Sequence, residues 1–241
     1  MITFSAKFRS KQAEIMDDLD FGGSEMSALL KDLAFVNRWL GGNSITWNGV
    51  KKLIRPGASL RVLDMGCGDG AQLRYLAVRA DDYRTDMDFT GVDANGNILE
   101  EARAMSRDFG RIHYRKLDVF SEELDLSETD VVLCTLFLHH FSNERIIELL
   151  LKVMSQVKVG VVVNDLHRSP LAFGLYRIFS RIFLKTKTAK HDGLVSIARG
   201  FRRKEIQAMA DALSKRSAIN FKSKIRWKWA FRYQWILSIT E

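Results

Sequence analysis

The middle of the chain alternates short apolar runs with longer segments in which apolar residues recur every three or four positions. The short runs predict strands, and the longer segments predict amphipathic helices. The predicted strands are residues 60–64, 89–93, 112–117, 130–136 and 158–164, and the helices between them are residues 71–80, 96–107 and 143–156. Strands that alternate with helices are typical of βαβ crossovers, so the pattern predicts a parallel sheet with helices on both faces.

The N-terminal region has no predicted strand and follows a helical pattern instead. Residues 12–54 are predicted to be helical, with breaks at the glycine pairs 22–23 and 41–42, because glycine interrupts helices. We therefore expect residues 1–57 to form an N-terminal helical cap.

The pattern changes again after the fifth predicted strand. Residues 170–184 and 202–213 predict two further helices. The segments SKIRWKWAF and RYQWILSI predict two terminal strands, because aromatic and β-branched residues are enriched in strands. These two strands could form a hairpin at the edge of the sheet. We expect residues 58–241 to form the main domain, with a lid-like insertion at about 166–200.

Charge is distributed unevenly along the 241 residues. Residues 1–165 contain 20 Lys+Arg and 25 Asp+Glu, a net charge of −5, whereas residues 166–241 contain 17 and 4, a net charge of +13. The basic third could meet an anionic substrate, a membrane surface or nucleic acid, or could be a solvated face without a partner. Within it, the basic amphipathic segment 171–187 could contact a lipid-like acceptor, lie on a membrane surface, or pack as an ordinary helix.

Cysteine content and hydropathy predict a cytoplasmic protein without a structural metal. Cys67 and Cys134 form neither a disulfide framework nor a metal-ligand spacing. The first residues, MITFSAKFRSK, lack the apolar region of a secretory signal. No run approaches the ~18 apolar residues of a membrane span.

A glycine-rich loop, VLDMGCGDG at residues 62–70, follows the first predicted strand and precedes a helix. Gly66 and Gly68 allow a sharp turn and a close approach of the backbone to a ligand. In open α/β sheets such a ligand lies at the carboxyl ends of the strands. Glycines alone do not identify it, because Gly66, Gly68 and Ala71 also fit the dinucleotide fingerprint G-x-G-x-x-G/A.

Three carboxylates narrow the choice of ligand. Asp64 lies two residues before the first glycine, where it would repel a pyrophosphate and attract a cationic amino group. Asp93 ends the second predicted strand and could accept hydrogen bonds from both hydroxyls of a ribose. Asp118 follows the third strand and could accept a hydrogen bond from an adenine amino group.

The ordered series VLDMGCGDG, GVDAN, KLDVF and DVVLCTLFLHHF resembles the motifs of class I S-adenosylmethionine (SAM)-dependent methyltransferases over about residues 58–165. The resemblance implies an α/β fold with a Rossmann-like, seven-stranded, mostly parallel sheet whose last strand is antiparallel. It implies SAM as the cofactor. The donor-binding residues that it implies are Asp64, Gly66, Cys67, Gly68, Asp93, Ala94, Asn95, Asp118, Val119, Thr135 and Leu136.

More narrowly, LHHF and NDLHRSP are reminiscent of bacterial small-molecule methyltransferases near the quinone-biosynthesis group. The segment NRWLGG at 37–42 resembles a cap element of that group. This resemblance implies that Arg38 reaches the carboxylate of the donor.

Histidines are the candidate general bases, since an oxygen acceptor must lose a proton. His140 follows the fourth predicted strand, beside the expected methyl group, and its neighbour His139 belongs to the same pair. His167 follows the fifth strand, and His191 lies in the insertion. Each of His140, His167 and His191 could contact the acceptor or could serve packing and capping alone.

The sequence predicts methyl transfer to oxygen or carbon of a small, partly apolar metabolite that is phenolic, quinone-like or a polyketide. An RNA methyltransferase is an alternative, because the basic third contains Trp227, Trp229 and Trp235, which could stack on bases. The loop after the fourth strand lacks the Asn/Asp-Pro-Pro-Tyr/Phe pattern of amine methylation in nucleic acid, which disfavours that alternative. A non-catalytic SAM-binding module is the third possibility.

Overall fold

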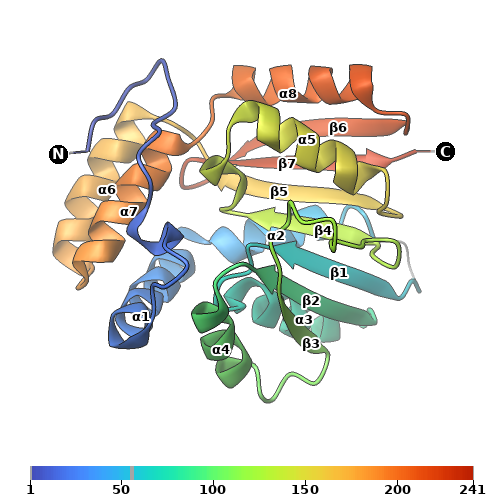
Figure 1. The fold of residues 1–241 in the computed structure, drawn as a ribbon, viewed down its shortest axis with the longest axis horizontal. Helices are drawn as coiled ribbons and strands as arrows, with labels where there is room; N and C mark the ends of the chain where they lie inside the picture. The colour runs from blue at the N-terminus through green and yellow to red at the C-terminus, as the bar shows by residue number, and fades with distance from the viewer. Residues whose placement is uncertain (1, 55–56, 241) are drawn as a thin grey trace.

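The computed structural model describes residues 2–54 and 57–240, apart from the side chain of Arg38. Seven strands form one sheet in the order β3-β2-β1-β4-β5-β7-β6 (Figure 1). The strands are β1 (Leu60–Met65), β2 (Met87–Asp93), β3 (Ile112–Lys116), β4 (Val131–Thr135), β5 (Gly160–Leu166), β6 (Phe221–Lys228) and β7 (Arg232–Ile239). The first five strands are parallel, and β7 is antiparallel to both of its neighbours. The predicted Rossmann-like sheet with an antiparallel last strand is confirmed.

The helices form two layers on the sheet and a third group beyond one end of it (Figure 1). They are α1 (Gly23–Leu40), α2 (Gly42–Val50), α3 (Ala71–Asp82), α4 (Gly96–Met105), α5 (Asn143–Met154), α6 (Pro170–Phe183), α7 (Lys187–Arg199) and α8 (Arg203–Arg216). The apolar residues of α2, α3 and α4 form a core against one face of the sheet, and those of α5 and α8 form a core against the other. Because both faces are covered, β5 is buried over six consecutive residues, as its apolar sequence predicts.

The terminal hairpin continues the sheet at its edge, as expected. β7 pairs with both β5 and β6, and this places Trp235 in the core with only 1% of its surface exposed. The prediction that Trp235 could stack on nucleic-acid bases is therefore wrong, because strand alternation turns its ring inward. Trp227 and Trp229 are exposed at the hairpin turn.

Helices α1, α6 and α7 lie beyond one end of the sheet and contact one another (Figure 1). Gly41 adopts a left-handed conformation with φ of 65° and ends α1, so the predicted break between the two N-terminal helices is confirmed. Gly193 lies inside α7. A Cβ atom at this position would lie 2.0 Å from the hydroxyl of Tyr176, so the glycine admits a tightly packed ring from α6.

The prediction of helix over residues 12–22 is wrong. This segment is extended except for one short 3₁₀ turn, η1 (Ile15–Asp17). The backbone N–H groups of Ile15 and Met16 donate to the Asp192 carboxylate on α7 at 2.9 and 3.0 Å, and so replace helical hydrogen bonds. Tertiary partners on α7 therefore override the local helical pattern.

Candidate functional site

A cavity of about 470 Å³ lies between the carboxyl ends of the strands and the N-terminal segment. The sheet side contributes residues from the loops after β1, β2, β3 and β4. The opposite side is formed by η1, α1 and the end of α7. The lining residues are Met16, Asp17, Leu19, Phe21, Met26, Leu29, Leu30, Gly66, Gly68, Asp93, Ala94, Asn95, Ile98, Leu117, Asp118, Val119, Leu136, Phe137, His140, Phe141 and Arg199. Its position matches the general rule that open α/β sheets bind ligands at their carboxyl ends.

The glycine loop forms the floor of this cavity. Gly66 and Gly68 have φ values of 66° and 54°, in the left-handed region that favours glycine. A Cβ atom on Gly66 would lie 2.1 Å from the ring of Phe137. Both the backbone conformation and the close approach of Phe137 therefore require glycine at position 66.

Asp93 connects the end of β2 to the glycine loop. Its carboxylate accepts hydrogen bonds from the backbone N–H of Gly68 and of Asn95, each at 3.0 Å. Burial raises the pKa of Asp93, and these two N–H groups oppose the rise without cancelling it. Asp93 is therefore held in a fixed position at the cavity wall.

Asn95 lines the cavity and also stabilises the backbone around it. Its side-chain oxygen accepts from the backbone N–H groups of Asn97 and Ile98 and caps α4. Its side-chain nitrogen donates to the carbonyls of Asp18 and Phe21, at 3.3 and 3.1 Å. Asn95 thus ties the N-terminal segment to the start of α4.

The remaining lining residues from the sheet side follow β2, β3 and β4. Ala94, Asp118, Val119 and Leu136 all line the cavity. Leu136 has a φ of 52°, which is unusual for a residue with a side chain. Its backbone N–H donates to the carbonyl of Asn164 at 2.8 Å. Strained backbone of this kind gathers at functional sites.

Three of the described residues that the resemblance implies, Asp64, Cys67 and Thr135, do not line the cavity. Asp64 is buried, and its Oδ1 has no hydrogen-bond partner among the described residues. Burial and the neighbouring Asp93 carboxylate raise the pKa of Asp64 well above its usual range. Cys67 is buried behind the loop, and the Thr135 hydroxyl lies 3.1 Å from that of Thr46 on α2. Arg38 belongs to α1, and its side chain lies outside the described part of the structure.

Of the three candidate bases, His140 is the one that lines the cavity. Its Nδ1 atom lies 2.7 Å from Oδ1 of Asp17, at ion-pair distance. The other oxygen of Asp17 accepts a hydrogen bond from the Arg199 guanidinium at 2.8 Å. Burial alone would raise the pKa of Asp17, but His140 and Arg199 outweigh it and lower this pKa. Asp17 is thus an ionised carboxylate beside the ring of His140.

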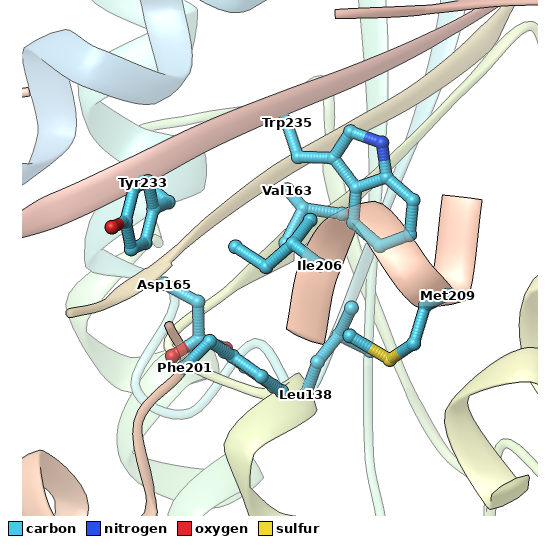
Figure 2. A pocket seen from close by; sticks show the side chains of 8 residues that line it. All are labelled: Leu138, Val163, Asp165, Phe201, Ile206, Met209, Tyr233 and Trp235. Atoms are coloured by element: carbon cyan, nitrogen blue, oxygen red, sulfur yellow. The ribbon is translucent and has the colours of Figure 1, made fainter. Parts of the chain in front are cut away.

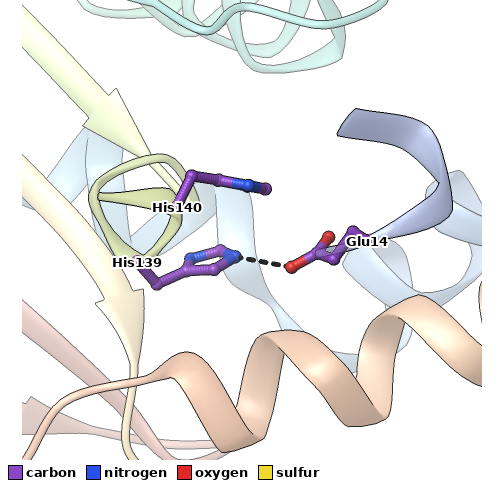
Figure 3. Close-up of side chains that lie close together, drawn as sticks. All are labelled: Glu14, His139 and His140. Carbon is purple, nitrogen blue, oxygen red and sulfur yellow. Dashed lines mark hydrogen bonds and ion pairs between the residues drawn. The ribbon is translucent and has the colours of Figure 1, made fainter. Parts of the chain in front are cut away.

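His139 is buried between the carboxylates of Glu14 and Asp165, and Figure 3 shows its contact with Glu14. Its Nδ1 lies 2.7 Å from Asp165 at the end of β5, and its Nε2 lies 3.2 Å from Glu14. Burial lowers the pKa of His139, but Asp165 and Glu14 outweigh burial and raise it to about 9. A protonated His139 therefore links the N-terminal segment to the sheet.

Glu14, His139 and His140 place potential metal-ligand atoms within 4.8 Å of one another (Figure 3). Both ring nitrogens of His139 already face carboxylates. Glu14 also accepts a hydrogen bond from Ser196 at 2.8 Å. Ion pairs and hydrogen bonds account for this cluster, so we interpret it as the attachment of the N-terminal segment.

His167 and His191 lie away from the cavity. Nδ1 of His167 accepts a hydrogen bond from Trp227 at 3.3 Å, beside the terminal hairpin. His191 contacts Asp192 and Gln12 on the outer side of α7. The structure thus places His140 at the cavity, whereas His167 lies beside the terminal hairpin and His191 contacts Asp192 on α7.

A second, much smaller hollow lies between α8 and the sheet (Figure 2). It measures about 10 Å³ and is lined mainly by apolar side chains, including Ile206, Met209 and Trp235. A space of this size is at the lower limit for one water molecule. It is a packing gap in the core.

Residues 62–160 match the family model described as a methyltransferase domain. This segment is similar to methyltransferase domains. The match begins within β1 and ends at the start of β5, so it includes the glycine loop, Asp93, Asp118 and His140. No sequence among the curated proteins matches the chain.

Solved methyltransferases share the fold of the whole chain. The plantazolicin methyltransferase BpumL in complex with S-adenosylhomocysteine (SAH) has a TM-score of 0.61 at 15% identity, over 90% of this chain and 95% of that chain. Magnesium protoporphyrin IX methyltransferase (ChlM) from Synechocystis PCC 6803 with bound SAH has a TM-score of 0.55 at 13% identity, over 88% and 86%. The CurJ carbon methyltransferase has a TM-score of 0.59 at 10% identity, over 83% and 54%. At these identities the likeness concerns the fold alone.

Several cavity residues outside the methyltransferase domain were not predicted as site residues. Met16, Asp17, Leu19 and Phe21 come from the N-terminal segment, and Arg199 comes from α7. Their sequence carries no motif, because they reach the site through tertiary contacts. The apolar stripe of α1, which also lines the cavity, was visible as a helical pattern.

The buried ion pairs of His139 predict a pH-dependent stability. A pKa raised from 6.5 to about 9 corresponds to ~3 kcal/mol of folding free energy. Because the folded pKa is the higher one, this contribution is fully present below about pH 6.5 and is lost as the pH rises through about 9. We expect urea denaturation of the wild-type protein to show this fall, and His139→Gln to remove most of it. The exposed His113 supplies the control, since His113→Gln should keep the wild-type profile. An unchanged profile in His139→Gln would contradict the assignment.

Proposed function

We propose that the protein is a SAM-dependent methyltransferase that acts on oxygen or carbon of a small, partly apolar metabolite. The observation that carries this proposal is the composition of the cavity. Its sheet side holds the glycine loop, Asp93 and Asp118, while its other side is mainly apolar, comes from the N-terminal segment and α1, and carries Asp17 and Arg199 as charged groups. A polar donor site and an apolar acceptor site would thus share one space.

The residues on the sheet side fit the parts of SAM. Gly66 and Gly68 would admit the methionine part close to the backbone beside Asp64, whose buried Oδ1 has no hydrogen-bond partner among the described residues. The cationic amino group of SAM would offset the charge of Asp64. Asp93 would hold the ribose hydroxyls, and Asp118 with Val119 would flank the adenine.

The opposite wall favours an apolar acceptor. Leu19, Phe21 and Met26 line this wall, and Phe137 and Phe141 from the loop after β4 add aromatic rings on the sheet side. Aromatic and aliphatic walls with a few polar groups are typical of small-molecule sites. A phenolic, quinone-like or polyketide acceptor would match this lining. Solved methyltransferases of plantazolicin and magnesium protoporphyrin IX share the fold and support a small-molecule acceptor.

His140 is the best-placed base for the acceptor. Bound SAM supplies an activated methyl group, so the chain has to align the acceptor and remove its proton. Asp17 lies beside Nδ1 of His140, which leaves Nε2 as the nitrogen that would take the proton. Asp17 would hold the ring in position and stabilise its charged form.

The N-terminal cap and the 166–200 insertion would roof the acceptor site. η1 and α1 supply the apolar wall, and α7 supplies Arg199. Arg199 also donates to the carbonyls of His139 and His140, at 3.2 and 2.6 Å. These contacts join the roof to the loop that carries the proposed base. A closed site of this kind excludes water and orients the reactants.

Calorimetry with SAM, SAH and NAD tests the donor. We expect SAM and SAH to bind and NAD to bind weakly or not at all. Asp93→Ala should lower the affinity for SAH about tenfold, because it removes charge-assisted hydrogen bonds worth ~1.5–3 kcal/mol. Asp88 is exposed on the same strand, so Asp88→Ala is the matched control. Binding of NAD without SAM would refute the proposal.

Incubation of cell extract with SAM and the protein tests the transfer itself. A small molecule whose mass rises by that of one CH2 unit, as expected when a methyl group replaces a hydrogen, would identify the acceptor. Methylated RNA as the sole product would favour the RNA alternative. Donor binding without any methylated product would favour a SAM-binding module instead.

A further inference from the structure

The outward face of α6 is apolar and is not covered by the described part of the chain. Leu171, Leu175, Ile178 and Ile182 follow one another at spacings of four, three and four residues, so they form one stripe along the helix. Each of these side chains has between 50% and 67% of its surface exposed. Figure 1 shows α6 at the outer edge of the molecule, away from the sheet.

The exposed stripe does not result from a loosely attached helix. On the other face of α6, the Tyr176 hydroxyl donates to the carbonyl of Ala189 on α7 at 2.8 Å. The ring of Phe179 stacks with that of Phe35 on α1, with centroids 6.1 Å apart. The inner face of α6 is therefore packed, and the outer face is left to an external partner.

Aromatic side chains extend the apolar face beyond α6. Phe183 at the end of α6 and Trp39 on α1 are 53% and 68% exposed. Phe35 contacts both, with ring centroids 6.2 Å from Phe183 and 5.9 Å from Trp39. Exposed aromatic rings beside aliphatic residues are typical of proteins that enter the interface of a bilayer.

Cations accompany this apolar face. Arg177, Arg181, Lys185 and Lys187 are all exposed. Residues 170–190 contain no aspartate or glutamate. Asp32, which accepts hydrogen bonds from the backbone at the start of α7, is buried. The face therefore combines exposed apolar side chains with uncompensated positive charge.

We propose that this face, α6 with Phe183 and Trp39, binds the surface of a membrane that contains anionic phospholipids. Leu, Ile, Phe and Trp enter the interface while Arg and Lys contact the lipid headgroups. A symmetric second copy fits the face less well, because Arg177 and Arg181 would lie opposite their own counterparts. The binding is peripheral, since no helix among the described residues is long and apolar enough to cross a bilayer. The inference does not depend on methyl transfer.

Vesicle sedimentation tests the proposal. The wild-type protein should sediment with vesicles of phosphatidylcholine and phosphatidylglycerol, and much less with phosphatidylcholine alone. Added salt should weaken the binding, because it screens the headgroup charge. The double variants Ile178→Ser/Ile182→Ser and Arg177→Glu/Arg181→Glu should each lower the partition coefficient at least about tenfold. Their side chains are exposed, so circular dichroism should show a retained fold.

A control variant separates this face from general basicity. Lys222→Glu/Lys224→Glu reverses two exposed charges on β6 and should bind the mixed vesicles nearly as the wild type does. Equal sedimentation of the wild type and both α6 variants would overturn the proposal, as would a wild type that stays in solution with mixed vesicles. A dimer that dissociates in Ile178→Ser/Ile182→Ser would also overturn it and assign the face to a second copy.

Discussion

A His140→Gln variant is expected to bind SAH like the wild type but to transfer methyl groups ~10²–10⁴-fold more slowly. His140 is the candidate base that lines the cavity, and Asp17 lies 2.7 Å from its Nδ1. Glutamine keeps a similar size but cannot take up the proton of the acceptor. The rate can be followed as isotope label that passes from SAM into a fixed amount of cell extract.

Two further variants make this prediction specific. Asp17→Asn should lower the transfer rate less than His140→Gln and should change its pH profile, because Asp17 acts through His140. His191→Gln is the control, since His191 lies on the outer side of α7 and contacts Asp192. If His140→Gln transfers label at the wild-type rate, His140 is not the base. In that case only the SAH titration would support the proposed donor site.

Gly66→Ala is expected to weaken SAH binding about a hundredfold or more. The left-handed backbone at position 66, with φ of 66°, costs ~1–2 kcal/mol with a side chain present. The added Cβ would also lie 2.1 Å from Phe137, which lines the cavity and would have to move. Each 1.4 kcal/mol lowers affinity about tenfold, so strain and displacement together account for the expected loss.

Gly23→Ala separates the clash from the strain. Gly23 has the same φ of 66°, and nothing lies within 4 Å of the position of its added Cβ. Calorimetry with SAH should therefore find near-wild-type affinity for Gly23→Ala, and thermal unfolding should find a smaller loss of stability for Gly23→Ala than for Gly66→Ala. Comparable SAH affinity in the two variants would place the donor away from the glycine loop.

Hydrogen bonds and ion pairs of charged side chains attach the N-terminal segment to the rest of the chain. Arg9 donates to the side chain of Asn143 and to the carbonyls of His139 and Arg199, at 2.9, 2.8 and 2.8 Å. Glu14 lies on the other side of the same loop, against His139. Removal of one member of such a network is costly because it leaves a buried charge without its partner. The cap is thus an integral part of the site and not a loose extension.

The periodicity of the sequence was sufficient to predict the alternation of strands and helices and the parallel sheet. Strands β1, β4 and β5 are buried over most of their residues, so their apolar runs are local signals that need no knowledge of partners. The glycine loop and the carboxylates that end β2 and β3 are also local features. Parallel strands align their carboxyl ends. The sequence by itself therefore predicted that Gly66, Gly68, Asp93 and Asp118 lie together at that edge of the sheet.

Only the tertiary structure decided which of the two adjacent histidines faces the cavity and which residues of the N-terminal segment line it. His139 and His140 are adjacent, yet one is held between Asp165 and Glu14 and the other lines the cavity beside Asp17. Glu14 reaches His139 across 125 residues of sequence, and Asp17 reaches Arg199 across 182. Contacts over such separations carry no periodic signal, because the side chains meet only after the sheet and α7 have formed. For the same reason the predicted helix over residues 12–22 does not form: the backbone N–H groups of Ile15 and Met16 donate to Asp192 instead, and only the folded chain brings that carboxylate to them.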